Sequence, residues 1–264
     1  YTGTVFKRLN AKDFSKEEPL LYGCFFQFAE DQEGNLWFAS TDGVYRCSMQ
    51  GKLLKKYDVS NSGLTNNTVF YVYPDSIGRL WIGTYSGLFL MDIETGKIRS
   101  DCFSSPIQST VKYIMEDSKN NIWICSENGL YKINQDLTIN KHYTKGDILP
   151  DNIVLSILED KQGNFWITTL KEIVKFDSTE SIHYTYRRMD GLIGTDFNNN
   201  VYQLDSNIIW WANEGGLIYT SEDDTNVDVK SVKHPIVSSY LIDKMEYDPT
   251  FRNQSEAITL YKDN

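Results

Sequence analysis

A short phrase that ends in tryptophan recurs five times in this chain, and its spacing limits the possible folds more than any other feature. The tryptophans stand 44, 42, 43 and 44 residues apart, at Trp37, Trp81, Trp123, Trp166 and Trp210. The first four copies begin with an aspartate six residues earlier (Asp31, Asp75, Asp117 and Asp160), and the degraded fifth begins with Leu204. Self-similarity at about 40–45 residues, built from strands, predicts an all-β fold of β-propeller blades with four strands each.

The second repeat shows the expected order of strands and turns most clearly. Strands are predicted over residues 68–73, 80–84, 88–92 and 98–103, with turns between them. Aspartate at the start of a turn accepts hydrogen bonds from the turn backbone, and glycine takes the positive φ that the turn needs. We therefore interpret the repeated aspartates as turn caps. Calcium is the less favoured interpretation, because it takes about six to eight oxygen ligands and each phrase supplies one carboxylate.

Four antiparallel strands per blade sort the loops onto two faces of the disc. The Asp-x-x-Gly turns and the Gly-Lys turns share one face, called here the turn face. The loops that enter the first strand or join the second strand to the third share the other, called the long-loop face. It holds residues 63–67, 145–152 and 190–200, with short turns at 41–42, 85–86, 127–128, 170–171 and 213–214. Variable loops on a rigid scaffold are the usual place for binding.

The repeated tryptophans are predicted to pack between neighbouring sheets. A large ring at the same place in every blade fills the wedge between blades, and its N–H finds a partner there. A row of sugar-binding tryptophans is the alternative, and the regular spacing argues against it. Trp211 breaks the pattern, since earlier repeats have Phe or Ile after the tryptophan, and it is a candidate for ligand binding.

Charge and cysteine usage exclude some classes of function. The net charge of −10 leaves no basic face for a phosphate backbone, so no nucleic-acid partner is expected. No run of 18 apolar residues and no basic-then-apolar leader occurs in the sequence, so the chain as it stands is expected to contact a membrane only through parts outside it. Cys24, Cys47, Cys102 and Cys125 lack metal-ligand spacing; unpaired buried thiols are favoured over a disulfide, and no metal or cofactor is expected.

The repeats divide the chain into two predicted parts. Residues 1–225 form propeller blades, of which residues 1–10 are a partial blade. Either the chain is a piece of a longer propeller, which we favour, or Val5–Leu9 closes a ring as the missing fourth strand of the last blade. Residues 226–264 are predicted to be a linker and the beginning of an Ig-like β-domain, with strands near residues 234–242 and 257–261.

Several phrases resemble the two-component regulator propeller repeat over residues 20 to about 220. They are Gly63-Leu-Thr-Asn-Asn-Thr68, Asp75-Ser-x-Gly-x-Leu-Trp-Ile-Gly-Thr84 and Gly87-Leu88. Residues 190–197 and 215–218 resemble the last blade of that family, and the tail resembles the start of its triple-tyrosine-motif Ig-like domain. The resemblance implies two seven-bladed propellers, with this chain taken from the second, in the periplasmic sensor of hybrid two-component receptors of Bacteroides-type bacteria. Such receptors detect glycan fragments and switch on polysaccharide-utilisation genes.

What the resemblance implies for this chain is a non-catalytic sensor module. Its partners would be an oligosaccharide ligand, the remaining propeller blades and Ig-like domain of the same receptor, and a second receptor in a homodimer. A membrane-anchored histidine kinase and a transcriptional regulator would lie in other parts of the protein. The family has no catalytic residue to carry over.

Three hypotheses for function follow. In the first, an oligosaccharide binds the long-loop face, with polar amides pairing its hydroxyls and an aromatic ring stacking on a sugar; the candidates are Asn66, Asn67, Tyr85, Asn152, Asn198, Asn199, Asn200 and Trp211. The second is a propeller enzyme, a glycosidase with carboxylates from Asp42, Glu127, Glu172 and Glu214 or a lyase. A histidine-based lyase is disfavoured, since His142 and His183 fall on fourth strands and His234 lies outside the propeller. The third is a protein-interaction scaffold.

Overall fold

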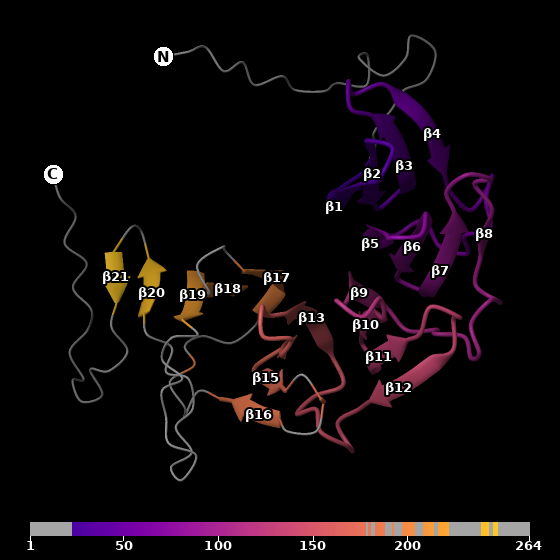
Figure 1. Ribbon diagram of the computed structural model, residues 1–264. Coiled ribbons are helices and arrows are strands. Elements are labelled where there is room, and N and C mark those ends of the chain that lie inside the picture. The colour runs from indigo at the N-terminus through magenta and orange to yellow at the C-terminus, as the bar shows by residue number, and fades with distance from the viewer. Residues whose placement is uncertain are drawn as a thin grey trace, which may run out of the picture.

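The described part of the chain is built from strands alone. The computed structural model describes residues 23–177, 179–180, 183–187, 192, 197–203, 208–213, 216–221, 239–242 and 245–247. Within these residues the strands form five antiparallel sheets, and no helix is long and apolar enough to cross a membrane. The sheets follow one another along an arc, with the first strand of each sheet on its inner side (Figure 1). The predicted β-propeller architecture is thus confirmed.

Each of the first four blades has four strands that pair in chain order. Blade 1 holds β1 (Phe25–Glu30), β2 (Asn35–Ser40), β3 (Gly43–Ser48) and β4 (Leu53–Tyr57). Blade 2 holds β5 (Val69–Pro74), β6 (Arg79–Thr84), β7 (Gly87–Asp92) and β8 (Ile98–Arg99). Blade 3 holds β9 (Val111–Glu116), β10 (Ile122–Ser126), β11 (Gly129–Ile133) and β12 (Ile139–Tyr143). Blade 4 holds β13 (Val154–Glu159), β14 (Phe165–Thr169), β15 (Ile173–Phe176) and β16 (His183–Tyr186).

The fifth sheet has five strands: β17 (Phe197–Gln203), β18 (Ile208–Asn213), β19 (Gly216–Ser221), β20 (Ser239–Ile242) and β21 (Met245–Tyr247). Here β20 pairs with β19 and takes the place of a fourth strand, and β21 pairs with β20. The boundary between a propeller at 1–225 and a second domain at 226–264 stays a prediction, as does the role of Val5–Leu9, which lies outside the described residues.

The aspartate of each phrase caps its turn and also holds the repeat tryptophan. In blade 3, Asp117 Oδ1 accepts hydrogen bonds from the backbone N–H groups of Lys119 and Asn121, at 2.9 and 2.8 Å. The other oxygen accepts the indole N–H of Trp123 at 2.9 Å. The same indole bond occurs in blades 1, 2 and 4 at 2.8, 2.8 and 2.9 Å. A buried N–H needs such an acceptor, so the two repeated residue types form one structural unit.

The tryptophans of blades 1 to 4 lie in the walls between blades. Trp37 is fully buried in an apolar cluster with Val69 and Leu80 of blade 2. Trp81 packs likewise on Val111 and Ile114 of blade 3. Trp123 and Trp166 occupy the corresponding clusters at the next two boundaries. Each ring therefore joins its own blade to the following one, as an interblade packing role requires.

The fifth blade departs from this arrangement. Trp210 has the backbone register of the repeat tryptophans, because it lies opposite Tyr219 as Trp166 lies opposite Lys175. Leu204 stands where the other repeats have aspartate, and the buried indole N–H of Trp210 has no hydrogen-bond partner within the described residues. The next residue, Trp211, faces the opposite way and packs on Trp166, with ring centroids 5.6 Å apart.

Two smaller differences from the sequence predictions concern blade 2 and the cysteines. The fourth strand of blade 2 contains only Ile98 and Arg99 instead of extending to Phe103. Phe103 still packs on Trp81, with ring centroids 5.7 Å apart, so the chain keeps the apolar contact after leaving the sheet. All four cysteines are free thiols, and Cys24 is exposed rather than buried.

Candidate functional site

Backbone hydrogen bonds tie the loops of the long-loop face together. The Gly43 N–H donates to the Asn67 carbonyl at 2.8 Å, and the Gly129 N–H donates to the Asn152 carbonyl at 2.7 Å. The Tyr85 N–H donates to the Thr68 carbonyl at 2.9 Å. The Gly43 and Gly129 bonds join a turn between the second and third strands to the loop that enters the next blade, and the Tyr85 bond joins such a turn to the loop that enters its own blade. The predicted grouping of these loops on one face is therefore present and rigidly built.

Three of the candidate asparagines use their side chains to shape their own loops. The Asn66 side-chain oxygen accepts the Thr68 N–H at 2.7 Å. Asn67 accepts the Val59 N–H and Asn152 accepts the Lys145 N–H, each at 2.8 Å. These oxygens are engaged with backbone, which is the usual role of asparagine in loops. The amide N–H groups of the same side chains remain the part that a ligand could use.

The other candidates divide between the last blade and blade 2. Asn198, Asn199 and Asn200 lie within β17 rather than in a loop. Trp211 is 2% exposed in the core between blades 4 and 5, which favours packing over ligand contact. Tyr85, in contrast, is 61% exposed. The residues on either side of it are bonded to each other. The Thr84 hydroxyl donates to the Gly87 carbonyl and accepts the Ser86 N–H.

The turn that carries Tyr85 is held in a single shape. Gly87 has a φ of +141°, and a Cβ there would lie 2.3 Å from the Ile107 carbonyl oxygen, so only glycine fits. The Tyr85 carbonyl also accepts the Thr110 hydroxyl at 3.2 Å. An exposed ring on so constrained a turn loses little backbone entropy when it binds a ligand.

Every inner strand carries a β-bulge at the same place, a feature that the sequence analysis missed. The strand pairing skips Phe26, Phe70, Lys112 and Leu155 in blades 1 to 4, and skips residues 198–200 in blade 5. Phe26, Phe70, Lys112, Leu155 and Asn199 each stand 11 residues before the tryptophan of their repeat. Bulges re-aim side chains and are common beside functional sites.

Three of the bulged residues and one carboxylate form a continuous group, called here the bulge cluster: Phe26, Phe70, Lys112 and Glu127. The rings of Phe26 and Phe70 have centroids 5.0 Å apart, and Lys112 Nζ lies 4.9 Å from the Phe70 ring centroid. Lys112 Nζ also pairs with Glu127 at 2.8 Å. Phe26 is 46% exposed, so an aromatic face remains open. Leu155 instead packs against blade 5.

The bulge cluster is connected to Tyr85 through Thr110. The Thr110 carbonyl accepts the Glu127 N–H at 3.0 Å, and its hydroxyl donates to the Tyr85 carbonyl. Two exposed rings, a cation and a carboxylate thus lie on one connected framework at the long-loop ends of blades 1 to 3. Aromatic faces and charged hydrogen-bonding groups are suited to binding a polar ligand with apolar C–H surfaces.

The described carboxylates of the glycosidase hypothesis are each paired with a cation. Asp42 binds Lys56 at 2.7 Å, and Glu172 binds Arg187 at 3.2 Å. Burial acts to raise the pKa of Glu127, but hydrogen bonds from Lys112 and Thr110 outweigh it and hold that pKa below its ordinary value. A general acid needs a raised pKa, so Glu127 is unsuited to that role. Glu214 lies outside the described residues.

The two described histidines lie on the fourth strands of their blades. His142 lies on β12 and His183 on β16, the fourth strands of blades 3 and 4, and His234 lies outside the described residues. Within the described residues no group of three or more His, Cys, Asp or Glu side chains could hold a metal ion.

The fold and this site define the class of the chain: a β-propeller module with its varied loops and bulged inner strands on one face. Residues 63–86 and 148–171 match the family model described as two component regulator propeller. A comparison with curated proteins gave no match.

Solved structures similar to the chain include extracellular receptor domains. One is the extracellular domain of the hybrid two component system BT3049 from B. thetaiotaomicron, at 26% identity and TM-score 0.66 over 76% of this chain and 28% of that one. Another is that of BT4673 from the same organism, at 18% identity and TM-score 0.65 over 81% and 30%. The chain therefore spans less than a third of the length of these domains.

An enzyme also shares the fold. Virginiamycin B lyase from Staphylococcus aureus matches at 14% identity and TM-score 0.60, over 76% of this chain and 67% of that one. This likeness concerns the fold alone. The family model and the 26% identical extracellular domain both belong to two-component systems.

Proposed function

We propose that this chain is the ligand-binding propeller module of an extracytoplasmic, periplasmic receptor and that it binds an oligosaccharide on the long-loop face. The observation that carries the proposal is the exposed Tyr85 ring on a constrained turn, joined through Thr110 to the bulge cluster. The 26% identity to an extracellular domain of a hybrid two-component system supports the sensor role.

The chemistry of the face suits a sugar chain. Tyr85 and Phe26 present apolar ring faces on which the C–H face of a pyranose can stack. Lys112 and Glu127 lie beside these rings and supply a donor and an acceptor for hydroxyl groups. The amide N–H groups of Asn66, Asn67 and Asn152 would add contacts along the loops.

Signal relay is the second part of the proposal. A ligand shifts an equilibrium only by its difference in affinity between two states, so the sugar must favour one arrangement of this module against the rest of the receptor. The receiving parts would be the other propeller blades, the Ig-like domain and a membrane-anchored histidine kinase with its transcriptional regulator, in a homodimer. The regulated genes would be those for polysaccharide utilisation.

Calorimetry with a panel of plant and host oligosaccharides tests the proposal. We expect one ligand to bind the protein and the substitution Tyr85→Ala or Phe26→Ala to weaken it about tenfold, since a buried aromatic contact is commonly worth more than about 1 kcal/mol. Tyr184→Ala is the matched control, because Tyr184 is an exposed tyrosine on the fourth strand of blade 4. Equal binding by Tyr85→Ala, Phe26→Ala and the parent would refute this site, and capture of a protein partner without sugar binding would favour the scaffold hypothesis.

A further inference from the structure

A cation covers the face of the repeat tryptophan in each of blades 1 to 4. In blades 1, 3 and 4 it comes from the third strand, at the position directly opposite the tryptophan: Arg46, Lys132 and Lys175. The cationic groups lie 5.1, 5.0 and 4.5 Å from the ring centroids. In the same three blades an asparagine four residues after the aspartate donates its amide to that carboxylate: Asn35, Asn121 and Asn164.

Blade 2 reverses both choices. Leu90 stands opposite Trp81, where the other blades have a cation. Arg79 stands where they have asparagine, and its guanidinium covers the Trp81 ring at 5.2 Å while Nε donates to Asp75 at 2.6 Å. The tryptophan therefore keeps a cation over its ring, and the aspartate keeps a side-chain donor. At this position of the third strand, blade 2 has the shorter side chain of Leu90 in place of the long Arg or Lys side chain of the other blades.

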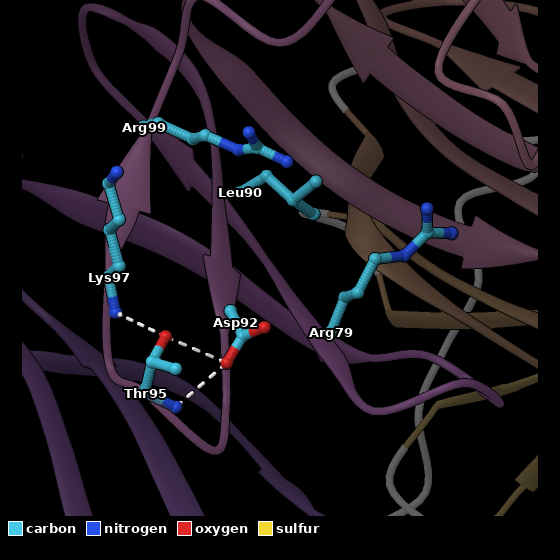
Figure 2. Close-up of a pocket in the computed structure, with 6 residues that line it drawn as sticks. All are labelled: Arg79, Leu90, Asp92, Thr95, Lys97 and Arg99. Atoms are coloured by element: carbon cyan, nitrogen blue, oxygen red, sulfur yellow. Dashed lines mark hydrogen bonds between the residues drawn. The ribbon is translucent and has the colours of Figure 1, made fainter.

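The exchange leaves a hollow on the turn face of blade 2. A pocket of about 210 Å³ opens there, lined by Arg79, Leu90, Asp92, Thr95, Lys97 and Arg99. Figure 2 shows Leu90 between the side chains of Arg79 and Arg99, with Asp92 and Thr95 at the adjacent turn. The pocket thus has an apolar floor and a polar rim, and it lies on the opposite face from Tyr85.

The rim is rich in positive charge, although the whole chain carries −10. Arg79 is held in place by Asp75 and by the Gln135 carbonyl of blade 3, which accepts from Nη1 at 3.1 Å. Within the described residues Lys97 and Arg99 make no ion pair, and they add two cations to the rim.

The single carboxylate of the rim is already engaged. Asp92 Oδ1 accepts the Thr95 N–H at 2.7 Å and the Thr95 hydroxyl at 2.8 Å. These two bonds, with a smaller contribution from the charge of Arg99, lower the pKa of Asp92. The charge of Arg79 is neutralised by Asp75. The remaining rim charges are the cations of Lys97 and Arg99 and the carboxylate of Asp92, so a bound anion would neutralise the net positive charge.

We propose that this pocket binds a carboxylate or sulfate group carried on a single sugar ring. Guanidinium groups recognise such oxyanions through paired N–H donors, and Lys97 adds a point charge. Leu90 would contact the C–H face of the ring, and Asp92 would accept a hydroxyl. The site lies on the turn face and does not depend on the proposed function of the long-loop face.

Titration with three monosaccharides, followed by NMR shifts or calorimetry, tests the charge requirement. Glucuronate and glucose 6-sulfate should bind, and neutral glucose should bind at least about tenfold more weakly, since charge-assisted hydrogen bonds supply most of the affinity. Binding should weaken as salt rises, because the rim is open to solvent. Binding of glucose as tight as that of glucuronate, or no saturable binding of either acidic sugar, would overturn the proposal. Inorganic sulfate that matches glucose 6-sulfate would refute the sugar part of it.

Two sets of variants locate the site. Arg99→Gln should weaken glucuronate binding about tenfold. Lys52→Gln is the matched control. Gly51-Lys52 of blade 1 occupies the same turn position as Gly96-Lys97 of blade 2, but blade 1 has Leu54 at the position of Arg99. The double variant Arg79→Asn/Leu90→Lys rebuilds the arrangement of blade 3, so it should fold, fill the pocket and lose binding. Retained glucuronate affinity in both Arg99→Gln and the folded double variant would contradict the assignment.

Discussion

At the scale of the residue, the hydrogen bond between aspartate and tryptophan explains why the two residue types recur together. One carboxylate closes the turn through its first oxygen and fixes the indole through its second, as Asp117 and Trp123 show. Because the indole fills the wall between blades, a local turn and a long-range contact depend on the same side chain. The asparagines of the long-loop face illustrate the opposite case, since their bonds remain within their own loops.

The substitution Asp117→Ala should be strongly destabilising. It leaves the Trp123 indole N–H and the backbone N–H groups of Lys119 and Asn121 without their acceptor, and a buried unsatisfied group costs about 1–3 kcal/mol. We expect the urea midpoint of unfolding to fall clearly. Asp136→Ala, at an exposed turn of the same blade where Asp136 caps Thr138, is the control and should shift the midpoint much less. Equal shifts would show that the indole bond contributes nothing.

At the scale of the element, blades are joined on the turn face by side chains that cross from one sheet to the next. Ser76 donates its N–H and hydroxyl to Glu116, and Ser118 does the same to Glu159. Glu180 of blade 4 receives Lys132, Lys141 and the Tyr143 hydroxyl of blade 3. These contacts set the angle between consecutive sheets, in addition to the apolar wall.

The Glu180 contact predicts a dependence of stability on pH. Burial acts to raise the pKa of Glu180, but hydrogen bonds from Lys132, Tyr143 and Lys141 outweigh it, so the pKa lies below its ordinary value of 4.5. A carboxyl group with a lowered folded-state pKa stabilises above its unfolded pKa and loses that contribution as pH falls through the folded one. We expect the parent to lose stability below about pH 4.5 more steeply than Glu180→Gln.

The measurement is the urea midpoint between pH 3 and pH 7 for both proteins. At neutral pH Glu180→Gln should be less stable by about 2–4 kcal/mol, because the mostly buried Lys132 ammonium loses its partner. Glu94→Gln, at an exposed turn of blade 2, is the control. Parallel pH profiles for the parent and Glu180→Gln would show that this carboxylate does not contribute to the acid sensitivity.

At the scale of the whole molecule, the outer sheet face of blade 1, at the start of the arc, exposes apolar side chains. Phe28 is 67% exposed and packs on Phe38, with ring centroids 5.9 Å apart, on the side of blade 1 that points away from blade 2. Phe25 also contacts Phe38. Sheet faces of this kind are covered in stable assemblies, since contiguous exposed apolar surface promotes association.

The remaining propeller blades of the proposed receptor would cover this face, so we expect the isolated chain to self-associate through blade 1 and the substitution Phe28→Ser to weaken that association. Burying a phenylalanine contributes about 1.5–3 kcal/mol, so the dissociation constant should rise about tenfold or more. Ile77→Ser is the control, because Ile77 is 58% exposed at a turn in blade 2. Analytical ultracentrifugation measures the effect. Unchanged association in Phe28→Ser would assign the contact to another surface.

The sequence predicted the blades well because their chemistry repeats at every period. The site was harder to predict, for physical reasons that particular residues show. Phe26 and Phe70 each follow another apolar residue, so an extra residue makes no visible break in the apolar pattern, and the bulges emerge only from the pairing with the second strand. The same limit applies to Asn67, because sequence does not reveal whether an amide is already bonded to its own loop.

The exchange between Arg79 and Leu90 also bears on how a repeat protein diversifies. Restoring Lys at position 90 alone would bring a second cation to a ring that Arg79 already covers, and losing Arg79 alone would strip Trp81 of its cover. Each single substitution therefore disturbs the cover of Trp81, whereas the paired substitution keeps it, so in related blades we expect a cation at one of the two positions and not at both.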